Sequence, residues 1–98
     1  MIAIRVLAHG KPEQLVFQET PTPPISDDQV LIDVHYSGIN FPDTLIIQGK
    51  YQYQPPLPFT PGGEVSGVVS AVGKNITHLQ VGDRVISGCS WGGYAEQV

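Results

Sequence analysis

Apolar and polar residues alternate along several short stretches of this chain, a pattern typical of β-strands with one buried face. The clearest stretch covers residues 30–37, where every second residue from Val30 to Tyr36 is apolar and the opposite face carries Asp33 and His35. This stretch predicts a long, half-buried strand. Weaker strand patterns cover residues 2–7, 15–19, 64–72 and 94–98, and residues 81–86 predict a turn followed by a strand.

One segment, residues 40–48, carries the signals of a short helix instead. Asn40 can cap a helix, Pro42 suits the first turn, Asp43 is favoured at the positive N-terminal end, and Gly49 can end it. Many short strands separated by turn residues, together with one small helix, predict a mostly β domain that forms a partly closed barrel.

Composition agrees with a single folded domain. The chain has 98 residues, of which 41% are hydrophobic and 14% charged. Eleven glycines and nine prolines supply the turns between strands. The net charge is −4 and the five basic residues are scattered, which argues against a nucleic-acid-binding protein. No apolar run approaches the roughly 18 residues of a membrane span, so we expect no membrane partner.

Cysteine and histidine usage limits the chemistry of the chain. Cys89 is the single cysteine, which excludes an internal disulfide and favours a reducing, cytoplasmic setting. His9, His35 and His78 lie far apart, and none stands beside a second metal ligand. The glycine-rich nucleotide motifs are absent as well. The chain therefore encodes no complete site for a nucleotide, a phosphate or a metal ion.

Three stretches in register resemble the medium-chain dehydrogenase/reductase superfamily, and within it the zinc-free quinone oxidoreductases. They are residues 37–44 (SGINFPDT) followed by 48–51 (QGKY), residues 61–69 (PGGEVSGVV), and residues 81–85 (VGDRV) followed by 91–96 (WGGYAE).

The resemblance covers the whole chain and implies a GroES-like, partly open β-barrel with one short helix. The Rossmann domain that binds NAD(P)H in this family is absent from this chain. We therefore expect residues 1–98 to be an N-terminal GroES-like domain, truncated at its C-terminal end. On this view the final strand is interrupted at Val98 and leaves a free sheet edge.

The resemblance also implies chemistry without zinc. The zinc-dependent alcohol dehydrogenases of the superfamily have a cysteine ligand where Asn40 stands and a histidine ligand where Gly63 stands, just before Glu64. Asparagine is a poor zinc ligand and glycine has no side chain. The implied reaction is NADPH-dependent reduction of a quinone or an enone by a cytoplasmic, homodimeric parent enzyme. The cofactor would be bound mainly by the missing domain, so we expect this chain alone to be inactive.

Five residues are candidates for the active site, and each also has a structural reading. Asn40 is either a helix cap or an amide that faces the nicotinamide or the substrate oxygen. Asp43 is either a charge that stabilises the helix start or an active-site acid. Tyr51 could donate its hydroxyl to substrate or simply pack. Tyr53 and Trp91 are candidates for lining the substrate, with packing as the alternative. We expect Glu64 to be half-buried and paired with Arg84, and Cys89 to be an inert, packed thiol.

Two other functions remain open on sequence alone. A GroES-type co-chaperonin has a similar length, and residues 67–85 are similar to its pattern. Such a protein needs a mobile apolar loop, however, and prolines and Tyr51 occupy the corresponding place. A stand-alone binding module is the second alternative, since a fold does not determine a function.

Overall fold

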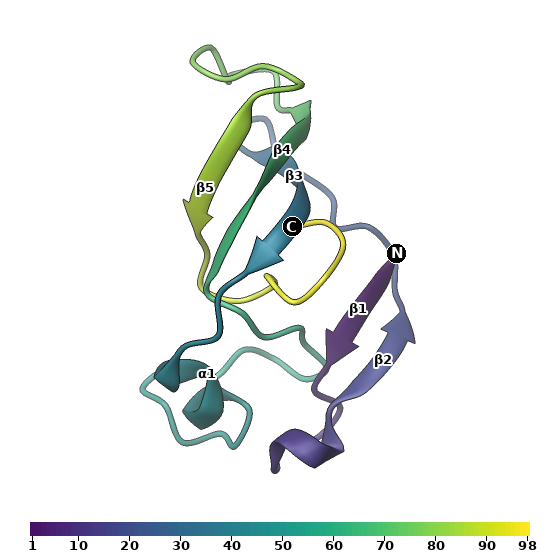
Figure 1. Cartoon of the computed structure of the whole chain (residues 1–98), viewed down its shortest axis with the longest axis vertical. Coiled ribbons are helices and arrows are strands. Elements are labelled where there is room, and N and C mark those ends of the chain that lie inside the picture. Colours follow the sequence, from purple (N-terminus) through teal and green to yellow (C-terminus); the bar gives the residue numbers. More distant parts are fainter.

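The computed structural model describes residues 1–98 and arranges five strands in two antiparallel sheets (Figure 1). One sheet pairs β1 (Ile2–Arg5) with β2 (Val16–Glu19), and the other has the order β3 (Val30–Ser37), β4 (Glu64–Val72), β5 (Arg84–Gly88). The helices are the 3-10 turn η1 (Pro12–Gln14) and α1 (Phe41–Ile46). The predicted mostly β fold with one short helix is thereby confirmed.

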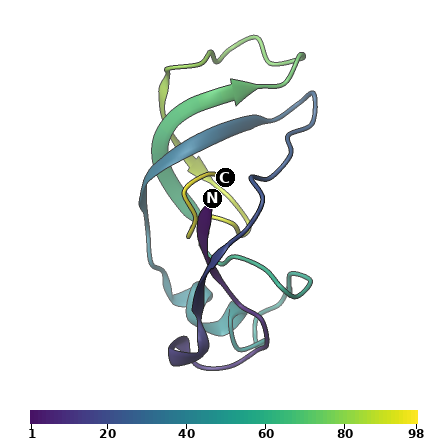
Figure 2. The same cartoon turned by 90° about the vertical axis from the view of Figure 1, so that its right-hand side faces the viewer.

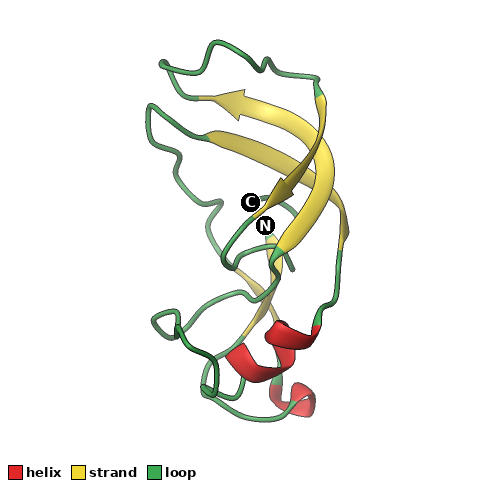
Figure 3. Ribbon diagram, turned by 90° about the vertical axis from the view of Figure 1, so that its left-hand side faces the viewer, coloured by secondary structure: helices red, strands yellow, loops and turns green.

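The three-stranded sheet is strongly curved, and its concave side faces the rest of the molecule (Figure 2). The pairing of β3 with β4 is irregular at two places, between Leu31 and Ile32 and between Val34 and Tyr36. Such irregularities bend a strand and increase its local twist. The helical segments lie at the opposite end of the molecule (Figure 3), and none is long and apolar enough to cross a membrane.

A small apolar core lies at this helical end. Val6, Ile46, Ile47 and Phe59 form a buried cluster, and the half-buried ring of Tyr51 packs against it. The backbones of Val6 and Phe59 are joined by two hydrogen bonds of 2.8 and 3.2 Å, which fixes the loop after α1 against the end of β1. The core therefore fixes the position of α1, because Ile46 of the helix is one of its members.

The helix α1 is shorter than the predicted residues 40–48. It begins after Asn40, and Ile47 is its C-cap. Gly49 follows in the left-handed region, with φ at 69°, which ends the helix as expected.

The C-terminal segment, residues 94–98, is paired on both sides. On one side the Ile4 N–H of β1 donates to the Tyr94 carbonyl oxygen at 2.8 Å, and on the other the Val34 N–H of β3 donates to the Glu96 carbonyl oxygen at 2.8 Å. The expectation of a free edge along this segment is therefore wrong. The segment connects the two sheets, because Ala95 pairs with Ala3 of β1 and Gln97 pairs with Asp33 of β3 (Figure 1).

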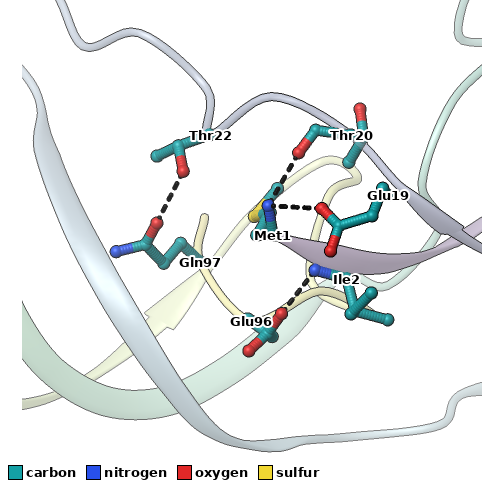
Figure 4. Close-up of polar contacts among 7 residues, drawn as sticks. All are labelled: Met1, Ile2, Glu19, Thr20, Thr22, Glu96 and Gln97. Atoms are coloured by element: carbon teal, nitrogen blue, oxygen red, sulfur yellow. Dashed lines mark hydrogen bonds and ion pairs between the residues drawn. The ribbon is translucent and has the colours of Figure 1, made fainter.

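The N-terminus is fixed in the same region (Figure 4). The Met1 ammonium group donates to the Thr20 carbonyl oxygen at 2.9 Å and lies 3.2 Å from the Glu19 carboxylate. The Thr22 hydroxyl donates to the Gln97 side-chain oxygen at 2.9 Å. The proline-rich connector after β2 is thus held against both chain ends.

The two sheets do not close into a barrel. β2 and β5 each have a neighbouring strand on one side only. The prediction of a partly open barrel is confirmed, and the open edges lie at β2 and β5 rather than at the C-terminus.

Candidate active site

Asn40 and Asp43 are held together at the start of α1. Asn40 has an extended backbone, with φ at −126° and ψ at 159°, and its N–H donates to Asp43 Oδ2 at 2.9 Å. The Asp43 N–H donates in return to the Asn40 carbonyl oxygen at 3.1 Å. Asn40 therefore occupies the N-cap position as predicted, but the side chain that stabilises this helix start is that of Asp43.

The side chain of Asn40 is consequently free of a capping role. Its Nδ2 donates to Glu64 Oε1 at 3.2 Å, and both side chains are exposed. A primary amide has two N–H donors and one carbonyl acceptor, so one donor and the oxygen remain available to a ligand. The site has room for this contact because a Cβ at Gly38 would lie only 2.0 Å from Glu64 Oε1.

The expected pairing of Glu64 with Arg84 is wrong. Glu64 lies opposite Gly88 in the ladder of β4 with β5, whereas Arg84 lies opposite Val68, four residues further along β4. Their side chains therefore stand at opposite ends of the shared ladder. Glu64 is also exposed rather than half-buried.

Asp43 is a buried carboxylate, with 6% of its surface exposed. Besides the Asn40 N–H, its Oδ2 accepts a hydrogen bond of 2.8 Å from the Tyr94 hydroxyl, 51 residues further along the chain. Burial, this hydrogen bond and the Asp43 charge all raise the pKa of Tyr94, so the hydroxyl keeps its proton and donates. Gly62, with φ at 110°, lets the Tyr94 ring approach, because a Cβ there would lie 2.6 Å from the ring.

Cys89 lies beside this carboxylate in a packed position. Its thiol donates to the Gly62 carbonyl oxygen at 3.4 Å, and its N–H donates to the Gly63 carbonyl oxygen at 2.8 Å. Burial first, and then the negative charge of Asp43, raise the pKa of the Cys89 thiol. A protonated thiol is a poor nucleophile, which agrees with the predicted inert role.

The three candidate aromatic residues form a row. The rings of Tyr51 and Tyr53 meet edge to face with centroids 5.2 Å apart, and the rings of Tyr53 and Trp91 lie 6.1 Å apart. The Tyr53 hydroxyl donates to the Ser90 carbonyl oxygen at 2.9 Å. Because the Tyr51 ring packs on the core, the structure favours its packing role, while Tyr53 and Trp91 remain exposed.

The structure does not bring all five candidates to one hollow. Trp91 lines a hollow of about 650 Å³ bounded by Arg5 and Thr60. Glu64, the hydrogen-bond partner of Asn40, lines a separate hollow of about 660 Å³. The candidates thus divide into an amide–carboxylate group at the start of α1 and an aromatic row on the neighbouring loops.

The donor atoms do not suit a metal ion. No three or more histidine, cysteine, aspartate or glutamate side chains come together in a way that could hold one. Gly63 offers no side chain, and Asp43 Oδ2 is already engaged by two hydrogen-bond donors.

Tyr94 is the residue of this group that sequence reasoning overlooks. In the sequence, Tyr94 is only the first residue of the strand pattern over residues 94–98, and nothing in the local pattern relates it to Asp43. The fold brings the two together because residues 94–98 lie between β1 and β3. A contact over 51 residues leaves no periodic signal in one sequence.

An open, mostly β structure with one short helix is the architecture of a GroES-like domain. Residues 26–98 match the alcohol dehydrogenase GroES-like domain family, and the chain belongs to this family. Its homologues are quinone oxidoreductases of the medium-chain dehydrogenase/reductase superfamily.

Individual comparisons agree with this assignment. The chain is 46% identical over 98 residues to the quinone oxidoreductase of Homo sapiens, covering 98% of this chain and 30% of that protein. It is 47% identical over 85 residues to quinone oxidoreductase-like protein 2 of Rattus norvegicus, covering 87% of this chain and 24% of that protein. The crystal structure of Escherichia coli quinone oxidoreductase complexed with NADPH superposes with a TM-score of 0.90 at 34% identity, covering 100% of this chain and 30% of that one. The chain thus spans less than a third of these relatives.

Proposed function

We propose that this chain is the substrate-side domain of an NADPH-dependent quinone or enone oxidoreductase that works without zinc. The observation that carries the proposal is the exposed amide of Asn40. Asp43 holds its backbone N–H and Glu64 accepts one of its side-chain N–H groups, so the second N–H and the amide oxygen remain available. The structure of the Escherichia coli relative complexed with NADPH supports the choice of cofactor.

Asn40 would act by hydrogen bonding. Its second N–H can donate to a carbonyl oxygen of the substrate and stabilise negative charge that develops there. Quinones and enones suit such a donor, because conjugation spreads the incoming charge and weaker electrophilic help suffices. Bound NADPH would supply the hydride. The same amide could instead contact the nicotinamide.

Asp43 would be a positioning residue. It touches the backbone of Asn40 and the hydroxyl of Tyr94, and both contacts fix the turn from which the Asn40 side chain projects. A catalytic hydroxyl of Tyr51 and a substrate-lining role of Tyr53 and Trp91 remain predictions.

Zinc does not suit the donor atoms of this site. The amide of Asn40 and the two carboxylates of Asp43 and Glu64 do not supply the cysteine and histidine ligands typical of such sites.

A chimeric enzyme tests the proposal. The chain replaces the matching domain of Escherichia coli quinone oxidoreductase, and NADPH oxidation is measured with a quinone in the presence of a metal chelator. We expect quinone-dependent turnover by the chimera and none by the 98-residue chain alone. In the chimera, Asn40→Ala should lower kcat by about 100-fold, the typical effect of losing one such donor.

The control is Gln52→Ala, which removes another exposed amide, in the loop after α1, and should leave kcat unchanged. A folded chimera that binds NADPH but reduces no quinone would refute the proposal. Loss of turnover on chelation would refute its zinc-free part.

A further inference from the structure

The exposed amide of Asn40 is oriented by a negatively charged group. Its Nδ2 donates to Glu64 Oε1 at 3.2 Å. Because the two N–H groups of an amide diverge, an oxygen atom that accepts from the second N–H lies about 5 Å from Glu64 Oε1. The carbonyl oxygen of a substrate held by Asn40 therefore lies close to this carboxylate.

No cation of this chain offsets the charge of Glu64. Glu64 is the single charged residue among the 10 that line its hollow of about 660 Å³, and the two ion pairs of the chain involve other residues. The buried carboxylate of Asp43 adds a second negative charge at the same helix start. After burial, this charge is the second cause of the raised pKa of the Cys89 thiol, so its field reaches neighbouring groups.

A negative site discriminates among carbonyl compounds by their charge, because like charges brought close together repel each other. An uncharged quinone or enone meets this repulsion only as charge develops on its oxygen, and conjugation spreads that charge over the molecule. A substrate that already carries a carboxylate meets the repulsion as soon as it binds. The arrangement therefore favours uncharged substrates.

We propose that Glu64 is a specificity-determining residue, which restricts the site to uncharged quinones and enones and excludes substrates that carry a carboxylate near the reacting carbonyl. This inference rests on the proposed function, since it places the substrate oxygen at the amide of Asn40. It assigns to Glu64 an effect on the choice of substrate in addition to its contact with Asn40.

The two effects of Glu64 are separable by substitution. Its Oε1 orients the amide of Asn40 by accepting a hydrogen bond, whereas its charge repels anions. Glu64→Gln keeps an acceptor oxygen on a side chain of the same length and removes only the charge. Because the side chain of Glu64 is exposed, this variant leaves the packing of the fold intact.

Two matched substrates test the inference in the chimeric enzyme described above. One is a naphthoquinone that carries a carboxylate, and the other is the methyl ester of the same compound. The unmodified chimera should prefer the ester in kcat/KM. Glu64→Gln should raise kcat/KM for the carboxylate relative to the ester by about five- to tenfold, the effect expected when one of two like charges less than about 10 Å apart is removed. The comparison between enzymes cancels the intrinsic reactivities of the two quinones.

Ionic strength gives a second measurement that a purely structural role of Glu64 leaves unchanged. The Debye length falls from about 30 Å at 0.01 M to about 3 Å at 1 M. Between these two conditions, the preference of the unmodified chimera for the ester should weaken, while that of Glu64→Gln should hardly change.

The matched control is Asp28→Asn, which removes an exposed carboxylate that contacts Asn75 beyond the other end of β4. β4 separates this group from Glu64 by about 20 Å or more, so the substrate preference should stay the same. Turnover of the ester shows that each variant is folded and binds NADPH.

The outcomes separate the inference from the proposed function. A chimera that reduces neither quinone refutes the proposed function and the inference with it. A chimera that reduces the ester but keeps the same preference after Glu64→Gln overturns the inference alone. So does an unmodified chimera that reduces the carboxylate as well as it reduces the ester.

Discussion

Replacing Tyr94 with phenylalanine tests whether the contact between Tyr94 and Asp43 stabilises the fold. The substitution removes one hydroxyl and leaves the ring, which packs against Gly62. The lost hydrogen bond is 2.8 Å long, and its acceptor is a buried carboxylate. Hydrogen bonds to charged groups contribute about 1.5–3 kcal/mol, and because Tyr94 is only partly buried we expect about 1.5–2 kcal/mol.

A loss of this size is easily measured in a domain of this length. It corresponds to a fall in Tm of roughly 6–16 °C, since 1 kcal/mol shifts Tm by about 4–8 °C in domains of 60–100 residues. Urea unfolding followed by the fluorescence of Trp91, the single tryptophan, gives the free energy of unfolding, and far-UV circular dichroism gives Tm.

Tyr36→Phe is the matched control, because it deletes the same hydroxyl from a ring that is 78% exposed. It should change the free energy of unfolding by less than about 0.5 kcal/mol. In a double-mutant cycle with Asp43→Asn, we expect a coupling energy of about 1 kcal/mol between Tyr94 and Asp43. Equal stability of the two tyrosine variants would refute the reasoning, and so would a coupling energy near zero.

One further prediction concerns the pH dependence of the Tyr94 contribution, and two concern Gly67 and Val6. The pKa of Tyr94 is raised above its ordinary value near 10. The contribution of its hydroxyl to the free energy of unfolding is therefore complete below about pH 10 and is lost as the pH rises. The stability advantage of the unmodified chain over Tyr94→Phe should then shrink by up to about 1.4 kcal/mol per pH unit. Urea midpoints on both sides of about pH 10 measure this, and an advantage that grows with pH would contradict it. Gly67→Ala should cost about 3 kcal/mol in urea unfolding, because the new Cβ would lie 2.0 Å from a backbone oxygen of β3, whereas Gly88→Ala meets nothing within 4 Å and should cost little. Val6→Ala should lower the free energy of unfolding by about 2–3 kcal/mol. Val81, which is 62% exposed, is the control, and Val81→Ala should cost less than about 0.5 kcal/mol. Similar losses for the two variants would show that Val6 is not part of the core.

The local features of the fold were largely predictable. The alternation over residues 30–37 corresponds to β3 (Val30–Ser37), and residues 64–72 correspond to β4 (Glu64–Val72). Asn40, Pro42 and Asp43 correctly predicted the start of α1, because capping depends on neighbours within one turn. The helix ended earlier than predicted, since tertiary packing decides how far so short a helix continues.

The partners of side chains across the fold were not predictable. Periodicity states which face a residue occupies, but not what lies opposite that face. The sequence therefore suggests Arg84, an opposite charge in a nearby stretch, as the partner of Glu64. The register of β4 with β5 keeps the two apart and leaves Glu64 near Asn40. For the same reason the sequence predicts an edge at residues 94–98, although they lie between two strands.

The C-terminal segment contributes both to the fold and to the candidate site. Residues 94–98 join β1 to β3, and the first of them, Tyr94, donates its hydroxyl to Asp43. Asp43 in turn holds the backbone of Asn40, so the position of the exposed amide depends on a segment 51 residues beyond the carboxylate. A buried carboxylate needs such donors, because burial of an unpaired charge is costly. We therefore expect the order of the Asn40 side chain to follow the pairing of the C-terminal segment.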